Sequence, residues 1–209
     1  MNREILYVAD PMCSWCWGFA PVMNGLVDHL AGRATITPIM GGLRPLTRTA
    51  MDDDMKSEIK HHWESVAARS GQPFDMSFFD RDGFVYDTEP PCRAVGVVRR
   101  MSPTKTLPYF EAVQREFYSE NQDVTDGAVL SRIAVDLGLD GDTFDNHFGD
   151  IASAYETAGD FNAARQLGVT GYPTVITVKD GDYTLLTAGY QDLAPLVGIL
   201  DSGLLEHSR

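Results

Sequence analysis

The sequence has few basic residues, few cysteines and no long hydrophobic run. Its 209 residues include 17 Lys and Arg against 30 Asp and Glu, which gives a formal net charge of −13. A chain of this charge repels phosphate, so we expect neither nucleic acid nor an anionic membrane surface as a partner. No segment approaches the roughly 18 consecutive apolar residues that a transmembrane helix needs. Three cysteines are too few for the disulfide framework of a small secreted domain.

The start of the chain also lacks the pattern of a secretory signal, because residues 1–4 lead into an apolar segment without a basic stretch before it. We therefore expect a cytoplasmic protein. In a reducing compartment, cysteines serve reactive chemistry more often than structural bridges. The length suits one domain with an insertion or two small domains.

Two of the cysteines form a C-x-x-C motif, Cys13-Ser14-Trp15-Cys16, which lies between a predicted strand at 5–9 and a predicted helix. Helix residues three apart lie on one face, about 5–6 Å from each other, close to the Cα separation that a disulfide prefers. The free N–H groups and positive dipole end of the helix favour a thiolate at Cys13. The motif predicts reversible dithiol chemistry, with Cys13 as nucleophile and Cys16, one turn deeper, as resolving thiol.

Periodicity divides the chain into an α/β start, a helical middle and an α/β end. The strand at 5–9, the helix that closes near Gly32 and a strand at 34–40 predict a βαβ unit with parallel strands. In the middle we expect helices at 51–70, from Pro90 to Met101, at 107–120, from a Thr125 cap to Gly138, and at 143–155. At the end we expect a helix at 161–167, strands at 175–178 and 183–188 joined by a hairpin turn, and a helix at 191–200.

A second motif, Gly171-Tyr172-Pro173-Thr174, comes directly before a predicted buried strand. Proline has no N–H and no liganding side chain, which argues against a metal site beside the cysteines. The order strand, C-x-x-C, helix, strand and later Gly-x-Pro-Thr, hairpin and final helix resembles the thioredoxin fold.

From end to end the chain resembles the DsbA-like branch of that fold, in which a helical block separates the two halves of the sheet. Cys13 and Pro173 are 160 residues apart, far more than a minimal thioredoxin needs. The resemblance implies an α/β thioredoxin fold with an inserted all-helical subdomain. Residues 1–45 and 161–209 would form the thioredoxin-like domain, and residues 46–160 the inserted helical domain.

Within that branch, the segments 10–19, 89–94 and 167–174 resemble FrnE-type proteins and predicted disulfide isomerases. The resemblance implies that Pro173 is cis and that its loop packs beside the cysteine pair, where Tyr172 and Pro173 would hold an extended substrate backbone. Ser14 and Trp15 would also contact substrate, since an aromatic plate at the site mouth suits an apolar or peptidic ligand. No organic cofactor is implied; a thiol pool such as glutathione would supply the electrons.

The chain departs from the branch at two points. Ser14-Trp15 stands where the periplasmic oxidase that names the branch has Pro-His, and because tryptophan carries no charge to stabilise a thiolate, we expect a less oxidising pair. Tyr7 stands near the strand position where thioredoxins have a buried carboxylate, and Asp10 is the nearest acid. Two roles stay open for Asp10, a proton relay for Cys16 and a turn residue, and the turn is favoured.

Structural roles are expected for several other residues. We expect Cys92 to be a small buried apolar residue, with a third thiol facing the site as the alternative. We expect Trp17 to lie in the core. His61 and His62 point to different faces of a helix, so they predict a solvated surface. The histidine spacing and the lack of a second C-x-x-C argue against a zinc site.

These features favour a thiol–disulfide oxidoreductase or isomerase that acts on protein or small-molecule thiols and disulfides. One alternative is a glutathione-dependent, non-redox enzyme of the kappa transferase or 2-hydroxychromene-2-carboxylate isomerase type, which has a serine in place of the nucleophilic cysteine. The other is a chaperone-like protein whose apolar groove holds unfolded chains.

Overall fold

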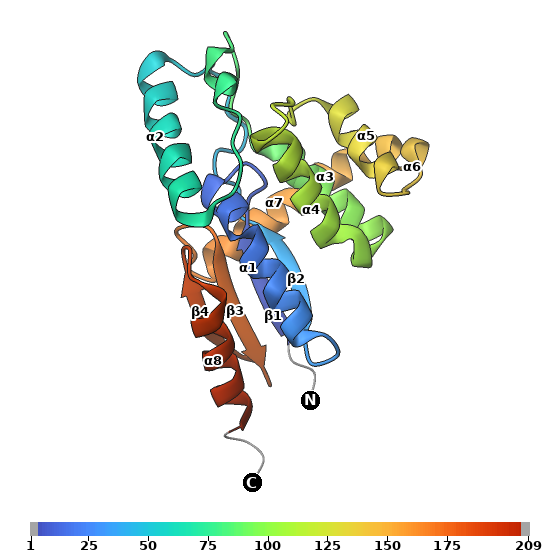
Figure 1. Cartoon of the computed structure of the whole chain (residues 1–209). Helices are drawn as coiled ribbons and strands as arrows, with labels where there is room; N and C mark the ends of the chain where they lie inside the picture. The colour runs from blue at the N-terminus through green and yellow to red at the C-terminus, as the bar shows by residue number, and fades with distance from the viewer. Residues whose placement is uncertain (1–3, 206–209) are drawn as a thin grey trace.

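A four-stranded mixed sheet with the order β2-β1-β3-β4 organises the structure, a computed structural model that describes residues 4–205 (Figure 1). The strands are β1 (Glu4–Ala9), β2 (Thr35–Met40), β3 (Thr174–Lys179) and β4 (Asp182–Ala188). The helices are α1 (Ser14–Leu30), α2 (Asp53–Ser70), α3 (Glu89–Met101), α4 (Thr106–Tyr118), α5 (Gly127–Asp136), α6 (Gly141–Gly149), α7 (Ile151–Gln166) and α8 (Leu193–Leu205), with 3-10 turns at Met76–Asp80 and Pro103–Lys105. Helices α1 and α8 lie on one face of the sheet and α7 on the other (Figure 1).

The sheet brings three loops to one edge. β1 is parallel to β2 and antiparallel to β3, and β3 forms a hairpin with β4. The parallel βαβ start and the C-terminal hairpin are therefore confirmed. Because β1 and β2 end where β3 begins, the residues that follow β1 and β2 meet the residues that precede β3.

Helix α1 carries Pro21 inside it, which removes one backbone donor. Proline cannot donate to the carbonyl four residues earlier, here that of Trp17. The side-chain amide of Gln72 donates to that carbonyl instead, at 3.1 Å. The Trp17 indole N–H in turn donates to the Pro73 carbonyl at 3.0 Å, and the side chain is only 4% exposed, so its predicted core position is confirmed.

The middle helices follow the predicted order, with two corrections. Thr125 does not cap α5: the Asp126 side chain accepts from the Ala128 N–H and takes that place. The helices predicted at 143–155 and 161–167 are instead α6 and α7, which meet at Asp150. Its carboxylate accepts from the Ala152 N–H, so it starts a new helix at 151 that continues without a break to Gln166.

An ion pair joins the helical block to the sheet. The Arg99 guanidinium binds both carboxylate oxygens of Asp160, at 2.8 and 3.0 Å, and also the Pro38 carbonyl at 2.7 Å. The same carboxylate accepts from the Met40 N–H at 3.1 Å. α3, α7 and β2 are thus held at one point, and the predicted boundary between residues 160 and 161 lies inside α7.

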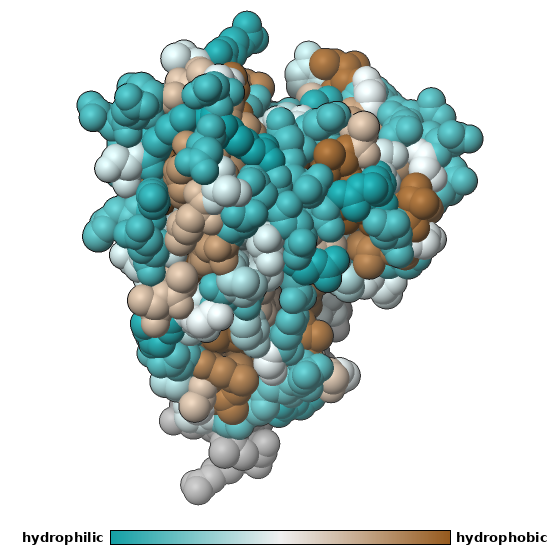
Figure 2. Space-filling model, turned by 45° about the horizontal axis from the view of Figure 1, so that its top comes forward, coloured by the Kyte–Doolittle hydropathy of each residue, from teal (hydrophilic) through white to brown (hydrophobic). Residues whose placement is uncertain are grey.

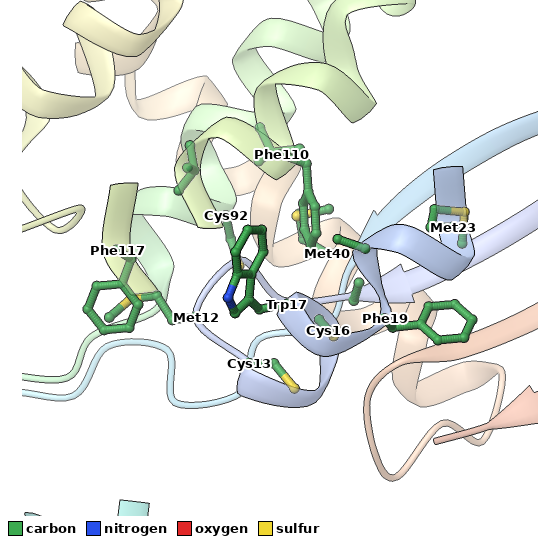
Figure 3. Close-up of a cluster of buried hydrophobic side chains, with 14 of the residues drawn as sticks. Met12, Cys13, Cys16, Trp17, Phe19, Met23, Met40, Cys92, Phe110 and Phe117 are labelled. Carbon is green, nitrogen blue, oxygen red and sulfur yellow. The ribbon is translucent and has the colours of Figure 1, made fainter. Parts of the chain in front are cut away.

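One buried core runs from the sheet into the helical block. Figure 3 shows Cys16 and Cys92 within it, among methionine and aromatic side chains. Trp63 of α2 has no exposed surface and packs against Phe78, Phe117 and Tyr118, with ring centroids 4.9–5.7 Å apart. The hydrophobic cluster of the inserted helices therefore continues the core of the sheet.

The surface is largely polar on the face that Figure 2 shows. The face seen in Figure 2 is mostly hydrophilic, with hydrophobic residues in small separate patches. Within residues 4–205, no helix combines the length and apolar character needed to span a bilayer.

Candidate active site

The cysteine motif lies where β1 passes into α1. Cys13 is the N-cap of α1, with extended dihedral angles (φ −93°, ψ 115°), and its N–H donates to the Asp10 carbonyl at 3.0 Å. Its own carbonyl accepts from the N–H groups of Cys16 and Trp17. The Cys13 side chain therefore sits at the positive end of the helix dipole, where negative charge is stabilised.

Cys13 and Cys16 are 3.5 Å apart, and both are free thiols. Cys13 is 6% exposed and Cys16 is completely buried. The Cys13 Sγ donates to the backbone carbonyl of Tyr172 at 3.6 Å, across 159 positions of the sequence. The peptide bond between Tyr172 and Pro173 is cis. The structure thus brings together the two sequence motifs, with Cys13 as the more accessible thiol.

Burial raises the pKa values of the two deeper groups, Cys16 and Tyr7. It raises the pKa of the Cys16 thiol well above its ordinary value, and the neighbouring Cys13 thiol raises it further. Tyr7, at the strand position noted in the sequence, is fully buried, and its pKa is raised first by burial and then by Cys16. Both groups are therefore neutral at physiological pH, as a resolving thiol should be before it reacts.

The Tyr172 ring fixes the loop before β3 against the loop after β2. Its hydroxyl donates to the Gly41 carbonyl at 2.7 Å, and burial raises the pKa of Tyr172 to about 12, so the donor keeps its proton. A Cβ on Gly41 would lie 2.1 Å from the ring atom Cε1, closer than any real contact. Glycine at 41 therefore allows the ring to approach the backbone closely.

Asp10 is a completely buried carboxylate beside the cysteine motif. Its oxygens accept from the backbone N–H of Met12 at 2.8 Å and of Leu43 at 2.7 Å, and from the Cys92 Sγ at 3.5 Å. Burial raises its pKa, and these hydrogen bonds oppose the rise. The carboxylate therefore organises the turn before Cys13 and ties it to the loop after β2; its relay role stays a prediction.

Cys92 is buried, yet it is more than a small apolar residue. Its exposed fraction is 0%, and its thiol donates to Asp10 across 82 positions. Burial raises the pKa of this thiol well above its ordinary value, and the Asp10 charge adds to the rise. The thiol is therefore protonated, and nothing in the local sequence around residue 92 indicates this contact.

A pocket of about 240 Å³ opens beside Cys13. Its walls include three residues that the sequence analysis named as substrate contacts: Ser14, Trp15 and Tyr172. Sequence reasoning did not find Arg44, which lines the pocket, and it placed His62 on the solvated surface: His62 is exposed, but it also lies in the wall. No group of three or more possible metal ligands occurs in the part of the chain that the structure describes.

Comparison with known families agrees with this geometry. The family model of the DSBA-like thioredoxin domain matches residues 4–201. The chain belongs to this family. Its fold, a thioredoxin fold of the DsbA type, is the one predicted from the sequence.

Solved structures of other proteins are similar to this DSBA-like chain in fold. A Nitrosomonas europaea protein, provisionally described as a protein disulfide isomerase, is 37% identical, covers 100% of both chains and has a TM-score of 0.93. The cytosolic disulfide reductase DsbM from Pseudomonas aeruginosa is 24% identical over 96% of this chain and 98% of its own, with a TM-score of 0.81. A second structure of DsbM was solved with GSH.

Among curated proteins, the DSBA-like chain is similar to the ClpXP adapter protein SpxH of Bacillus subtilis, with 23% identity over 174 residues. The match covers 82% of this chain and 57% of that protein. The chain thus spans about three fifths of the length of the curated relatives it matches.

Proposed function

We propose that this protein is a thiol–disulfide oxidoreductase that uses Cys13 and Cys16 as its redox pair. The observation that carries the proposal is the placement of Cys13, the more exposed of the two thiols, at a helix N-terminus beside a pocket, 3.5 Å from the fully buried Cys16. The Cys13 thiol also contacts the Tyr172 carbonyl. This arrangement supplies a nucleophile, a resolving thiol and a backbone acceptor in one place.

In the proposed reaction, the Cys13 thiolate attacks one sulfur of a substrate disulfide RS–SR. A Cys13–SR bond forms, the S–S bond breaks, and the first RS⁻ leaves and takes a proton. Cys16 then loses its proton and attacks the Cys13 sulfur, which releases the second RSH. Two electrons and two protons pass from the dithiol to the substrate, and the reverse sequence oxidises a dithiol.

Other residues have supporting roles in the proposal. The backbone of Tyr172, before Pro173, would pair with an extended substrate segment, while Trp15 and Ser14 in the pocket wall would contact its side chains. Asp10, which lies beside the motif and is fully buried, is the candidate acceptor for the Cys16 proton. No organic cofactor is required, since a thiol pool such as glutathione would regenerate the dithiol.

The comparisons support this direction. The Pseudomonas protein is named a cytosolic disulfide reductase, and the Nitrosomonas protein is provisionally described as a protein disulfide isomerase. We extend both descriptions to this chain as proposals, together with a cytoplasmic location. A 2-hydroxychromene-2-carboxylate isomerase shares the fold at 14% identity and a TM-score of 0.64, but the presence of both cysteines favours redox chemistry.

A trapping experiment tests the proposal. Wild type, Cys13→Ser, Cys16→Ser and Cys92→Ser are mixed with 2-hydroxyethyl disulfide, and the products are resolved by mass spectrometry. We expect an internal disulfide in wild type and Cys92→Ser, a stable mixed disulfide on Cys13 in Cys16→Ser, and no adduct in Cys13→Ser. Full turnover of an electrophile with glutathione by Cys16→Ser would instead support the non-redox isomerase or transferase, and peptide binding that survives loss of both thiols would support a chaperone.

A further inference from the structure

The loop between β2 and α2 carries a cation to the pocket beside Cys13. The Arg44 side chain is half-buried and lines the pocket. Within the described residues, no carboxylate lies within 4.0 Å of its guanidinium, and no side-chain or backbone acceptor is hydrogen-bonded to it. A guanidinium has five donors and cannot lose its charge, so the donors of Arg44 are free to bind an anionic ligand in the pocket.

The backbone that carries Arg44 is held firmly. The Arg44 N–H donates to the Thr88 hydroxyl at 3.1 Å, and the Thr88 N–H donates back to the Arg44 carbonyl at 3.3 Å. The preceding N–H, of Leu43, donates to Asp10 at 2.7 Å. Two residues later, Leu46 has a φ of 61°, and its N–H donates to Asp87 at 2.7 Å. The loop is thus fixed on both sides of Arg44 before any ligand arrives.

The charge of the pocket is opposite to that of the protein. The chain carries 30 acidic residues against 17 basic ones, but none of the residues that line this pocket, all of them described, is Asp or Glu. Its ionisable wall residues other than Cys13 and the two tyrosines are Arg44 and His62, and His62 pairs with the exposed Glu58 at 3.8 Å. The N-terminal end of α1 adds positive potential at Cys13.

We infer that Arg44 binds a carboxylate of the substrate, so that the pocket selects small disulfides that carry carboxylates, such as glutathione disulfide. This inference rests on the proposed redox function of Cys13 and names its substrate class. A pocket of about 240 Å³ is below the usual range of drug-sized sites, so it takes one small moiety rather than a folded surface. The guanidinium matches a carboxylate in two parallel hydrogen bonds.

The electron balance is that of the general reaction. Cys13 attacks one sulfur of glutathione disulfide and releases one glutathione, while the other stays bound through a Cys13–S bond. Cys16 attacks Cys13 and releases the second glutathione, and the two electrons come from the dithiol. For this substrate a thiol other than glutathione must regenerate the dithiol, and dithiothreitol is the reductant in the assay. Arg44 takes no proton and no electron; it holds the carboxylate so that the disulfide reaches Cys13.

The test compares two disulfides in wild type, Arg44→Gln, Arg44→Lys and the control Arg48→Gln, which removes an exposed arginine of the same loop. The measured quantity is kcat/KM for glutathione disulfide divided by kcat/KM for the uncharged 2-hydroxyethyl disulfide. We expect this ratio to fall about 10- to 100-fold in Arg44→Gln, because a charge-assisted hydrogen-bonded pair is lost. Arg44→Lys should keep part of it and Arg48→Gln all of it. An unchanged ratio in Arg44→Gln overturns the inference.

A binding arm separates this inference from the proposed function. S-methylglutathione has the same carboxylates but no reactive sulfur, so its binding to wild type and to Arg44→Gln is measured by calorimetry. We expect the variant to bind S-methylglutathione at least about 10-fold more weakly than wild type. If neither disulfide is reduced by wild type yet Arg44→Gln weakens this binding, the redox function fails and the carboxylate site stands. If the disulfides are reduced but the binding is equal in both proteins, the carboxylate site fails alone.

Discussion

Replacing Gly41 with alanine tests how the loop before β3, which carries Tyr172, is held at the site. The new Cβ would lie 2.1 Å from Cε1 and 2.3 Å from Cζ of Tyr172. The backbone cannot retreat easily, because the Gly41 N–H donates to the Ala9 carbonyl at 2.8 Å. The ring must therefore move and give up its hydrogen bond to the Gly41 carbonyl.

Overpacking of this kind costs about 1–3 kcal/mol, and the lost hydrogen bond about 0.5–1.5 kcal/mol. The smaller entropy of the unfolded alanine variant returns about 0.4–1 kcal/mol. We therefore expect Gly41→Ala to lower the free energy of unfolding by about 2–3 kcal/mol. Disulfide reduction should fall as well, because the Tyr172 carbonyl that faces Cys13 shifts with its ring.

The assay is denaturant unfolding of four proteins: wild type, Gly41→Ala, Tyr172→Ala and the double variant. If the clash is the cause, Gly41→Ala costs nothing in the Tyr172→Ala background, since the ring is gone. Gly171→Ala is the matched control: nothing lies within 4 Å of its added Cβ, so its stability should stay within about 0.5 kcal/mol of wild type. An equal cost of Gly41→Ala in both backgrounds would refute the reasoning.

Three further predictions concern buried groups around the site. Removing the Cys92 thiol by Cys92→Ala should cost about 1–2 kcal/mol of unfolding free energy in denaturant titrations, because Asp10 loses a donor, while disulfide reduction stays within twofold; a tenfold loss of rate would instead make Cys92 part of the reaction. Burial raises the pKa of Asp10, so the folded state binds this proton more tightly than the unfolded chain does. The wild type should therefore lose stability relative to Asp10→Asn as the pH rises above about 3.9. Unfolding of both proteins at pH 4.5 and pH 8 measures this, and an identical stability difference at both pH values would contradict it. Arg99→Ala should cost about 2–4 kcal/mol of unfolding free energy in denaturant titrations, because it leaves the 16%-exposed carboxylate of Asp160 without its cation. The control Arg100→Ala, which breaks a more exposed pair with Glu156, should cost under about 1 kcal/mol. Equal costs would show that the point where β2, α3 and α7 meet does not depend on the Arg99–Asp160 pair.

The four strands could be located from the sequence because each is an apolar run bounded by turn residues. The break at Asp150 could not, since the residues around it favour a helix on both sides and only the aspartate cap separates α6 from α7. The predicted division at residue 160 rested on the order of predicted elements and on the family resemblance. In the structure, Asp160 binds Arg99 and belongs to a continuous helix.

The two motifs of the site were visible in the sequence, but the contacts between them depend on the fold. Cys13 and Tyr172 carry their own local patterns, and the fold brings the Cys13 thiol to the Tyr172 carbonyl. The contact of Cys92 with Asp10 joins residues 82 positions apart, with no local pattern at either end. Arg44 reaches the pocket only because the loop after β2 is fixed by Thr88 and Asp10, which the sequence alone does not bring together.

The redox equilibrium of the three thiols tests the central proposal most directly. The protein is equilibrated in glutathione buffers of graded potential, quenched with an alkylating reagent and mapped by mass spectrometry. We predict one reversible two-electron transition between about −120 and −270 mV that links Cys13 to Cys16, while Cys92 stays reduced and is alkylated only after unfolding, because it is fully buried. If Cys13 and Cys16 stay unlinked across this range, or if the disulfide involves Cys92, the proposed redox pair is contradicted.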